Sequence, residues 1–328
     1  MNIYFQIAGL IIVAYLIILY SSHRKLGLRE ERAFVTILVA TFVNLTLDAL
    51  SVVAIHFMDM LPDLLVKISC KSYIISMMWL GLVDFCYVML DVGQTKVNRR
   101  KMISILSAVT AAASIVTASL PIEIYDNGTS VYTAGPAVMS VYVVTLMYIL
   151  ATMICAIVIR RTQNSRRGLA VIITTALWMV AAGIQFLNNE LLVVGFTSAV
   201  GVMILYIVME NPDANLDRQL GCFNSFALGM LLNRQLEEGN NTNILDVSII
   251  NIRSLENRGI DIKTKAREVI KEFNRDKDLY LFKNFNYGLV AVSDSEEKIE
   301  DVSGQLKKQL YSFGNLSKPK GSSDTDAD

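Results

Sequence analysis

The sequence contains little proline and histidine, and its first two thirds carry few charged residues. Transporter helices are often interrupted by glycine or proline at mid-membrane. All five prolines here lie outside the long apolar stretches or at their ends: Pro62, Pro121, Pro136, Pro212 and Pro319. Two histidines and four cysteines without paired spacing predict neither a metal site nor a disulfide framework. With no nucleophile–base pair and no phosphate-binding glycine loop, we expect no catalytic residues and no cofactor.

What the first 210 residues do contain is apolar sequence in seven stretches. The whole chain is 53% hydrophobic, with a mean hydropathy of +0.44. A helix of about 20 apolar residues crosses a bilayer, and a lone apolar segment in lipid must satisfy its own backbone hydrogen bonds. The sequence therefore predicts an α-helical membrane protein with seven transmembrane helices. They are expected over 4–21, 34–57, 67–91, 102–120, 136–159, 169–187 and 191–209.

Positive charge is confined to alternate gaps between these stretches. Of the 14 lysines and arginines in residues 1–210, only Lys67 and Lys71 lie outside three alternate loops. The other twelve are Arg24, Lys25, Arg29, Arg32, Lys96, Arg99, Arg100, Lys101, Arg160, Arg161, Arg166 and Arg167. Short loops rich in lysine and arginine stay in the cytoplasm. We therefore expect a multi-pass protein of the inner (plasma) membrane, with its N-terminus outside and its C-terminus cytoplasmic.

Four ionisable residues within the predicted spans are candidates for binding a ligand: Asp48, Asp84, His56 and Lys71. Such residues are costly in lipid and often functional. Because the second and third spans are antiparallel, we expect Asp48 near Asp84 and His56 near Lys71. The alternative is that these groups only join helices through hydrogen bonds. The outer loops are short, so an unknown small molecule would bind within the bundle or at the 121–135 loop, which is otherwise a plain connector.

The composition changes at Glu210, and the remainder reads as a small α/β unit. Residues 211–328 hold 16 basic and 19 acidic residues without a basic stripe, which argues against nucleic-acid binding. Hydrophobic spacing and turn residues predict helices, one strand and a hairpin. The helices are expected at 223–238, 262–274 and 295–312, and the strands at 244–252, 279–283 and 287–293. The polar segment 314–328 is predicted to be disordered.

The segment after Glu210 resembles the start of a GGDEF (diguanylate cyclase) domain. Asp217, Gly221 and Asn224 match the spacing of that family's opening motif, although Leu220 replaces its usual threonine and Ser225 its usual arginine. The chain is thus similar to bacterial signalling proteins that join a seven-helix sensor region, of the kind found before some histidine kinases, to a cyclase-type domain. The resemblance implies cyclic di-GMP signalling and a dimeric assembly.

The sequence differs from the family at the positions that carry catalytic activity in active members. The five-residue signature Gly-Gly-Asp-Glu-Phe of the family aligns with Phe285, Asn286, Tyr287, Gly288 and Leu289, so that both glycines are replaced by side chains and both acids are absent. Asn251 stands where the first strand of the family carries a metal-binding aspartate, and Asn257 and Asp261 are poor stand-ins for guanine contacts. Phosphoryl transfer relies on metal ions to neutralise charge. We expect an inactive, incomplete cyclase-like module, because the sequence also ends soon after Leu310.

The predicted organisation is a transmembrane sensor region at 1–210, a degenerate GGDEF-like domain at 211–313 and a disordered tail at 314–328. The leading hypothesis is an inner-membrane sensor whose output acts by protein–protein contact, as a homodimer or as a heterodimer with cyclase-type proteins. One alternative is a transporter or channel with a regulatory tail. Another is the N-terminal part of a longer cyclic di-GMP signalling enzyme.

Overall fold

The computed structural model describes residues 3–91, 99–126, 131–162, 165–188, 192–248, 257, 259, 261–274, 276, 278–284 and 288–315. The chain divides into two compact units, Met1–Asn211 and Pro212–Asp328.

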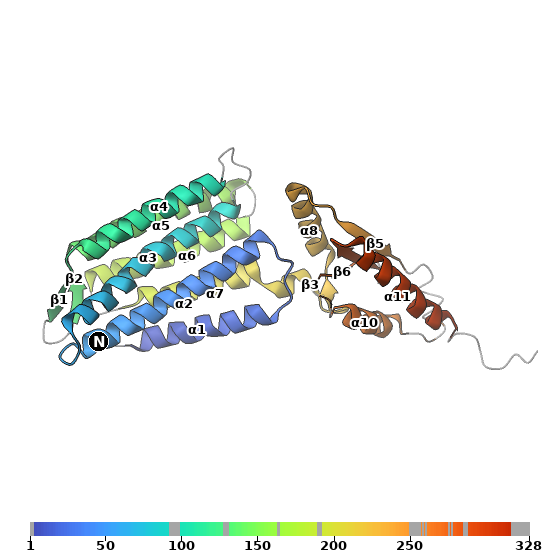
Figure 1. Ribbon diagram of the computed structural model, residues 1–328, viewed down its shortest axis with the longest axis horizontal. Helices are drawn as coiled ribbons and strands as arrows, with labels where there is room; N and C mark the ends of the chain where they lie inside the picture. Colours follow the sequence, from blue (N-terminus) through green and yellow to red (C-terminus); the bar gives the residue numbers. More distant parts are fainter. Residues whose placement is uncertain are drawn as a thin grey trace, which may run out of the picture. The chain divides into compact units, whose positions relative to one another are not determined.

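The first unit is a bundle of seven long helices that run side by side (Figure 1). All seven predicted spans are confirmed, since seven helices are long and apolar enough to cross a membrane. A short π-helix, η1, extends the seventh helix from Tyr206 to Glu210. The helices are α1 (Tyr4–Ser22), α2 (Arg29–His56), α3 (Asp63–Asp91), α4 (Arg99–Ser119), α5 (Pro136–Thr162), α6 (Ser165–Leu187) and α7 (Val194–Leu205).

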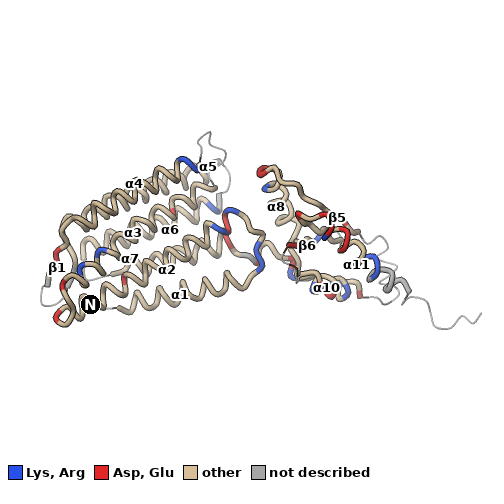
Figure 2. Tube along the Cα trace, in the orientation of Figure 1, with Lys and Arg blue, Asp and Glu red and all other residues tan. Residues whose placement is uncertain are grey.

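Close helix packing in this bundle depends on small residues. A Cβ placed on Gly201 of α7 would lie 2.6 Å from Thr174 Cγ2 of α6. A Cβ on Gly9 of α1 would lie 3.1 Å from Leu45 Cδ2 of α2. Small residues at helix interfaces allow backbones to approach in lipid, where no hydrophobic effect drives helices together. The basic residues of the α1–α2 connection and of the ends of α4, α5 and α6 lie at one end of the bundle (Figure 2).

The loop between α4 and α5, which the sequence leaves open as either part of a ligand pocket or a plain connector, contains a β-hairpin. Strands β1 (Glu123–Asp126) and β2 (Val131–Ala134) pair antiparallel, with Ile124 opposite Thr133. Gly135 follows β2 with φ of 107°, a backbone conformation that favours glycine. The tripeptide Asn127-Gly128-Thr129, whose sequence fits a glycosylation acceptor, lies outside the described residues.

The second unit is a five-stranded sheet with helices, which confirms the predicted small α/β fold. Its strand order is β3-β4-β6-β7-β5; β4 and β6 are parallel, and the other neighbouring pairs are antiparallel. The strands are β3 (Leu216–Asp217), β4 (Cys222–Phe223), β5 (Asn243–Val247), β6 (Tyr280–Lys283) and β7 (Leu289–Ser293). The helices are α8 (Ser225–Glu238), α10 (Ile262–Phe273) and α11 (Glu296–Asn315), and a 3-10 turn, η2, covers Pro212–Asn215.

Alternation along the strands explains how this unit forms its core. Leu279 and Leu281 point to the side where α10 and α11 contribute Ile270 and Leu306. Neighbouring positions Tyr280 and Phe282 instead contact Phe223 of β4, with ring centroids 6.3 and 5.5 Å apart. All five residues of β7 are buried, and this strand lies between β6 and β5 in the sheet. Strand β5 ends at Val247, which confirms the strand predicted for 244–252 over 244–247, and residues 249–252 lie outside the described residues. Helix α11 continues to Asn315, into the segment predicted to be disordered.

Candidate functional site

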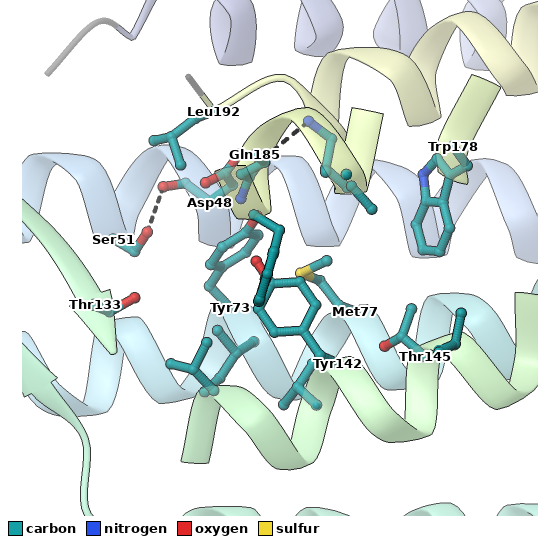
Figure 3. Close-up of a pocket in the computed structure, with 18 of the residues that line it drawn as sticks. Asp48, Ser51, Tyr73, Met77, Thr133, Tyr142, Thr145, Trp178, Gln185 and Leu192 are labelled. Atoms are coloured by element: carbon teal, nitrogen blue, oxygen red, sulfur yellow. Dashed lines mark hydrogen bonds between the residues drawn. The ribbon is translucent and has the colours of Figure 1, made fainter. Parts of the chain in front are cut away.

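A cavity of about 430 Å³ lies between helices of the first unit. Its volume is within the range of ligand-binding sites, which are typically concave, apolar and supplied with a few polar groups. Lining residues come from α2, α3, α5, α6 and the first residue of α7, Val194, and Thr133 of the hairpin and Leu192 also contribute. The side chains that give the cavity its chemistry are Asp48, Ser51, Tyr73, Met77, Tyr142, Thr145, Trp178 and Gln185 (Figure 3).

Asp48 is the buried acid of this cavity. Its side chain is 1% exposed, and its Oδ2 accepts a hydrogen bond from Gln6 Nε2 of α1 at 3.2 Å. Asp48 Oδ1 and Gln6 Oε1 have no hydrogen-bond partner among the described residues. Ser51, one turn along α2, donates to the backbone carbonyl of Asp48 and leaves the carboxylate untouched. The site therefore holds a buried carboxylate that lines the cavity and has one oxygen without a hydrogen-bond partner among the described residues.

Gly195 lets α7 pass close to this carboxylate. A Cβ at position 195 would lie 2.9 Å from Asp48 Oδ2 and 2.9 Å from Leu45 Cδ2. Both distances are shorter than real Cβ contacts, so a larger residue would displace either the acid or the helix. Asp48 is thus positioned by two helices, through a hydrogen bond from α1 and close backbone packing by α7.

Asp84 does not join Asp48, contrary to the sequence-based expectation. Asn44 Nδ2 donates to Ser76 Oγ at 2.7 Å, which places these residues of α2 and α3 opposite each other. In antiparallel helices, Asp84 then lies level with residue 36, so about 18 Å of helix rise separates it from Asp48. Asp84 lines a separate, smaller cavity of about 40 Å³, together with Thr41, Tyr148 and Trp178.

The other predicted pair, His56 and Lys71, is also not brought together. Lys71 Nζ donates to the carbonyl oxygen of Ala118 on α4 at 2.6 Å. The His56 ring packs edge-on against Phe57, with centroids 4.9 Å apart. The same antiparallel register explains the separation, since the residue of α3 level with His56 precedes Lys71 by almost two helical turns. Of the four ionisable candidates, only Asp48 lines the larger cavity.

Several neutral residues of the site were missed because the sequence analysis considered only ionisable side chains. Gln6 and Gln185 are amides within apolar stretches, and Gln185 Oε1 accepts from the backbone N–H of Val194 at 3.3 Å. Trp178 Nε1 donates to Ser198 Oγ at 2.5 Å. Polar residues in lipid-spanning helices form interhelical hydrogen bonds, and this rule could have found both amides.

In the second unit, two residues of the predicted opening motif, Asp217 and Gly221, form the turn between β3 and β4, and the third, Asn224, follows β4. Asp217 Oδ1 accepts from the backbone N–H groups of Gln219 and Leu220, and Gly221 has φ of 77°. Asn224 caps α8 by accepting from the N–H of Ala227 at 2.9 Å. Asp217 Oδ2 accepts from Lys283 Nζ at 2.7 Å. Burial raises the pKa of Asp217, but the hydrogen bonds from Lys283, Leu220 and Gln219 outweigh it, and the net pKa is lowered.

Only part of the predicted signature is described. Phe285, Asn286 and Tyr287 lie outside the described residues, as does Asn251. Gly288 accepts from the N–H of Asn284 at 2.8 Å, and Leu289 begins β7. Asp246 on β5 accepts from Asn284 Nδ2 at 3.1 Å. Near the described part of this hairpin, Asp217 and Asp246 thus both accept hydrogen bonds from side chains of the protein, Lys283 and Asn284. Within the described residues there is no group of three or more His, Cys, Asp or Glu side chains placed to hold a metal.

Compared with known proteins, the sequence matches no protein-family model and no curated protein sequence. The class of the protein therefore follows from its own features. It is a multi-pass membrane protein with seven apolar helices, followed by a small mixed α/β unit with a five-stranded sheet.

Proposed function

We propose that the seven-helix unit is a sensor that binds a small molecule in the cavity at Asp48. The observation that carries this proposal is the buried Asp48 Oδ1, which lacks a partner among the described residues and belongs to a side chain lining a cavity of about 430 Å³. An acid buried in a membrane helix without full pairing is costly and is retained for a purpose. The long uninterrupted helices favour a sensor over a carrier, whose binding helices are typically broken.

The C-terminal unit, in this proposal, acts as a non-catalytic, cyclase-like contact module on the cytoplasmic side. Its resemblance to GGDEF domains suggests partners of the same kind, either a second copy or an active cyclase-type protein. Metal-dependent phosphoryl transfer needs several carboxylates to hold metal ions. The engagement of Asp217 by Lys283 and of Asp246 by Asn284 supports a structural role for these acids.

The test of this output is an assay of the purified full-length protein in nanodiscs with GTP and Mg²⁺. An active diguanylate cyclase assayed in parallel serves as the positive control. The expected result is no cyclic dinucleotide above background from this protein. Detectable turnover that depends on protein concentration would reject a non-catalytic output.

Signal transfer between the units would start at the end of the seventh span. The π-helical segment η1 ends at Glu210, whose carboxylate accepts a hydrogen bond from Tyr87 of α3. π-Helical turns are rare and often occur at functional sites. A shift of α3 relative to α7 on ligand binding would change this contact and thereby the segment leading to Pro212.

A further inference from the structure

The cavity at Asp48 is lined by one acidic residue and by no basic residue among those described. Asp48 is its only charged lining residue among those described, with no lysine, arginine or histidine facing it. The other polar groups are hydroxyls of Ser51, Thr133 and Thr145, two tyrosine hydroxyls, the indole N–H of Trp178 and the amide of Gln185. A carboxylate in such a place repels anions and gains most from a positive ligand, because charge interactions are strong away from water.

Among the described residues, the carboxylate of Asp48 receives a single hydrogen bond, and two buried acceptor oxygens beside it have no partner. Gln6 supplies one N–H to Asp48 Oδ2, while Gln6 Oε1 and Asp48 Oδ1 remain without partners among the described residues. Exchanging the nitrogen and oxygen of the Gln6 amide would remove the one donor and relieve neither oxygen of Asp48. Unpaired buried acceptors are costly. A ligand with several N–H groups on one centre, such as an ammonium group, would supply donors to Asp48, which lines the cavity.

The remainder of the lining suits the body of such a ligand. Figure 3 shows Asp48, Tyr73 and Gln185 converging on one part of the cavity, with Tyr142 beside them and Trp178 further along. Aromatic faces attract cations, and this attraction is greatest where water is excluded. Met77, Met179 and Phe186 add apolar surface for a hydrocarbon group.

We infer that the cavity binds an organic monocation, with a primary or secondary ammonium group against Asp48 and an aromatic or branched aliphatic body against Tyr73, Tyr142 and Trp178. This inference rests on the proposed sensor function and specifies its ligand. A bare metal ion fits less well, because Ca²⁺ and Mg²⁺ require about six oxygen ligands. The described lining has a single carboxylate and is otherwise mostly apolar.

The test compares three probes of similar shape and different charge: phenethylammonium, 2-phenylethanol and phenylacetate. Each is titrated into the purified full-length protein in detergent, with isothermal calorimetry as the readout. The expected result is saturable binding of phenethylammonium only. Asp48→Asn, which preserves the shape of the side chain, is expected to weaken this binding at least about tenfold, equivalent to about 1.4 kcal/mol. Asp84→Asn serves as the matched control and is expected to bind as the wild type does.

Equal binding of 2-phenylethanol and phenethylammonium, or unchanged binding of phenethylammonium to Asp48→Asn, would overturn the cation assignment. Saturable binding of the alcohol would still leave the cavity as a small-molecule site, so the sensor proposal would survive that result. Absence of phenethylammonium binding at millimolar concentration would also overturn the inference. The probe comparison on the wild type needs no variant, so a folding defect in Asp48→Asn cannot obscure the outcome.

Discussion

Tyr87 of α3 donates a hydrogen bond to Glu210 Oε1 at 2.7 Å, across 123 positions of sequence. Glu210 ends the π-helical segment η1 and is only 9% exposed. Tyr87 and the neighbouring rings of Phe34, Tyr20 and Tyr206 pack together, with centroids between 5.1 and 6.3 Å apart. The last residue of the seventh span is therefore held by the third helix, next to an aromatic cluster at the same end of the bundle.

Tyr87→Phe removes this hydrogen bond and keeps the ring. Hydrogen bonds to charged groups contribute about 1.5–3 kcal/mol, so we expect a measurable loss of thermal stability of the full-length protein in detergent. Tyr15→Phe is the matched control, because Tyr15 of α1 is 62% exposed on the bundle. If Tyr87→Phe and Tyr15→Phe unfold at the same temperature as the wild type, the contact does not stabilise the end of the span.

Gly195→Ala tests the close packing of α7 against Asp48. The added Cβ would lie 2.9 Å from both Asp48 Oδ2 and Leu45 Cδ2, and overpacking typically costs about 1–3 kcal/mol. We expect lower thermal stability and weaker phenethylammonium binding. Gly183→Ala on α6 is the control for thermal stability alone, since a Cβ there meets nothing within 4 Å but Gly183 lines the cavity. The packing interpretation would be contradicted if Gly195→Ala and Gly183→Ala had the same thermal stability.

Asp217 should give the second unit a local acid sensitivity. Its pKa is lowered because hydrogen bonds from Lys283, Leu220 and Gln219 outweigh the opposing effect of burial. The folded pKa thus lies below the unfolded value of about 4, so the stabilisation is complete above that value. It is lost as the pH falls through the lowered folded pKa. This loss is measured as lower protection of residues 216–224 in hydrogen–deuterium exchange, after correction for the intrinsic pH dependence of exchange.

In the same exchange experiment, Asp217→Asn keeps an oxygen that can accept from the backbone N–H groups but cannot ionise. We expect its protection of residues 216–224 to be lower than that of the wild type at neutral pH and to stay constant on acidification. A wild-type protein whose protection stays constant over the same acid range would contradict the predicted contribution of Asp217.

The orientation of the chain remains a prediction from the charge pattern, and reporter fusions can test it. The twelve lysines and arginines in alternate loops predict that the connection between α1 and α2 and the C-terminal unit are both cytoplasmic. Alkaline phosphatase, which is active outside the cytoplasm, should be inactive when fused after Asp217 and active when fused after Asp59. The reverse pattern of activities would show the opposite orientation.

The sequence was sufficient for the spans because lipid imposes a length and a composition on each helix. It was insufficient for the site because the helix register depends on tertiary contacts such as Asn44 with Ser76. This register separates Asp48 from Asp84, although both acids were correctly singled out as lying within spans. The hairpin at β1 and β2 was missed because its strands have only four residues each.

In the second unit too, some elements could be predicted from the sequence and others could not. Helical periodicity located α10 and α11, since their apolar residues repeat at helical spacing and form one buried face. The two-residue strands β3 and β4 have no periodicity to detect, and they form because Asp217 and Gly221 make the turn between them. The opening motif thus contained the local information for these strands, although it was interpreted only as a family resemblance.

A sensor must transmit the occupancy of its cavity to its output unit. Hydrogen–deuterium exchange of the full-length protein in nanodiscs, with and without saturating phenethylammonium, follows residues 206–224. We predict a ligand-dependent change in the exchange of this segment in the wild type and in Asp84→Asn, and none in Asp48→Asn. A sensing role for the seven-helix unit would be contradicted if calorimetry showed the probe bound to the wild type but the exchange of residues 206–224 did not change.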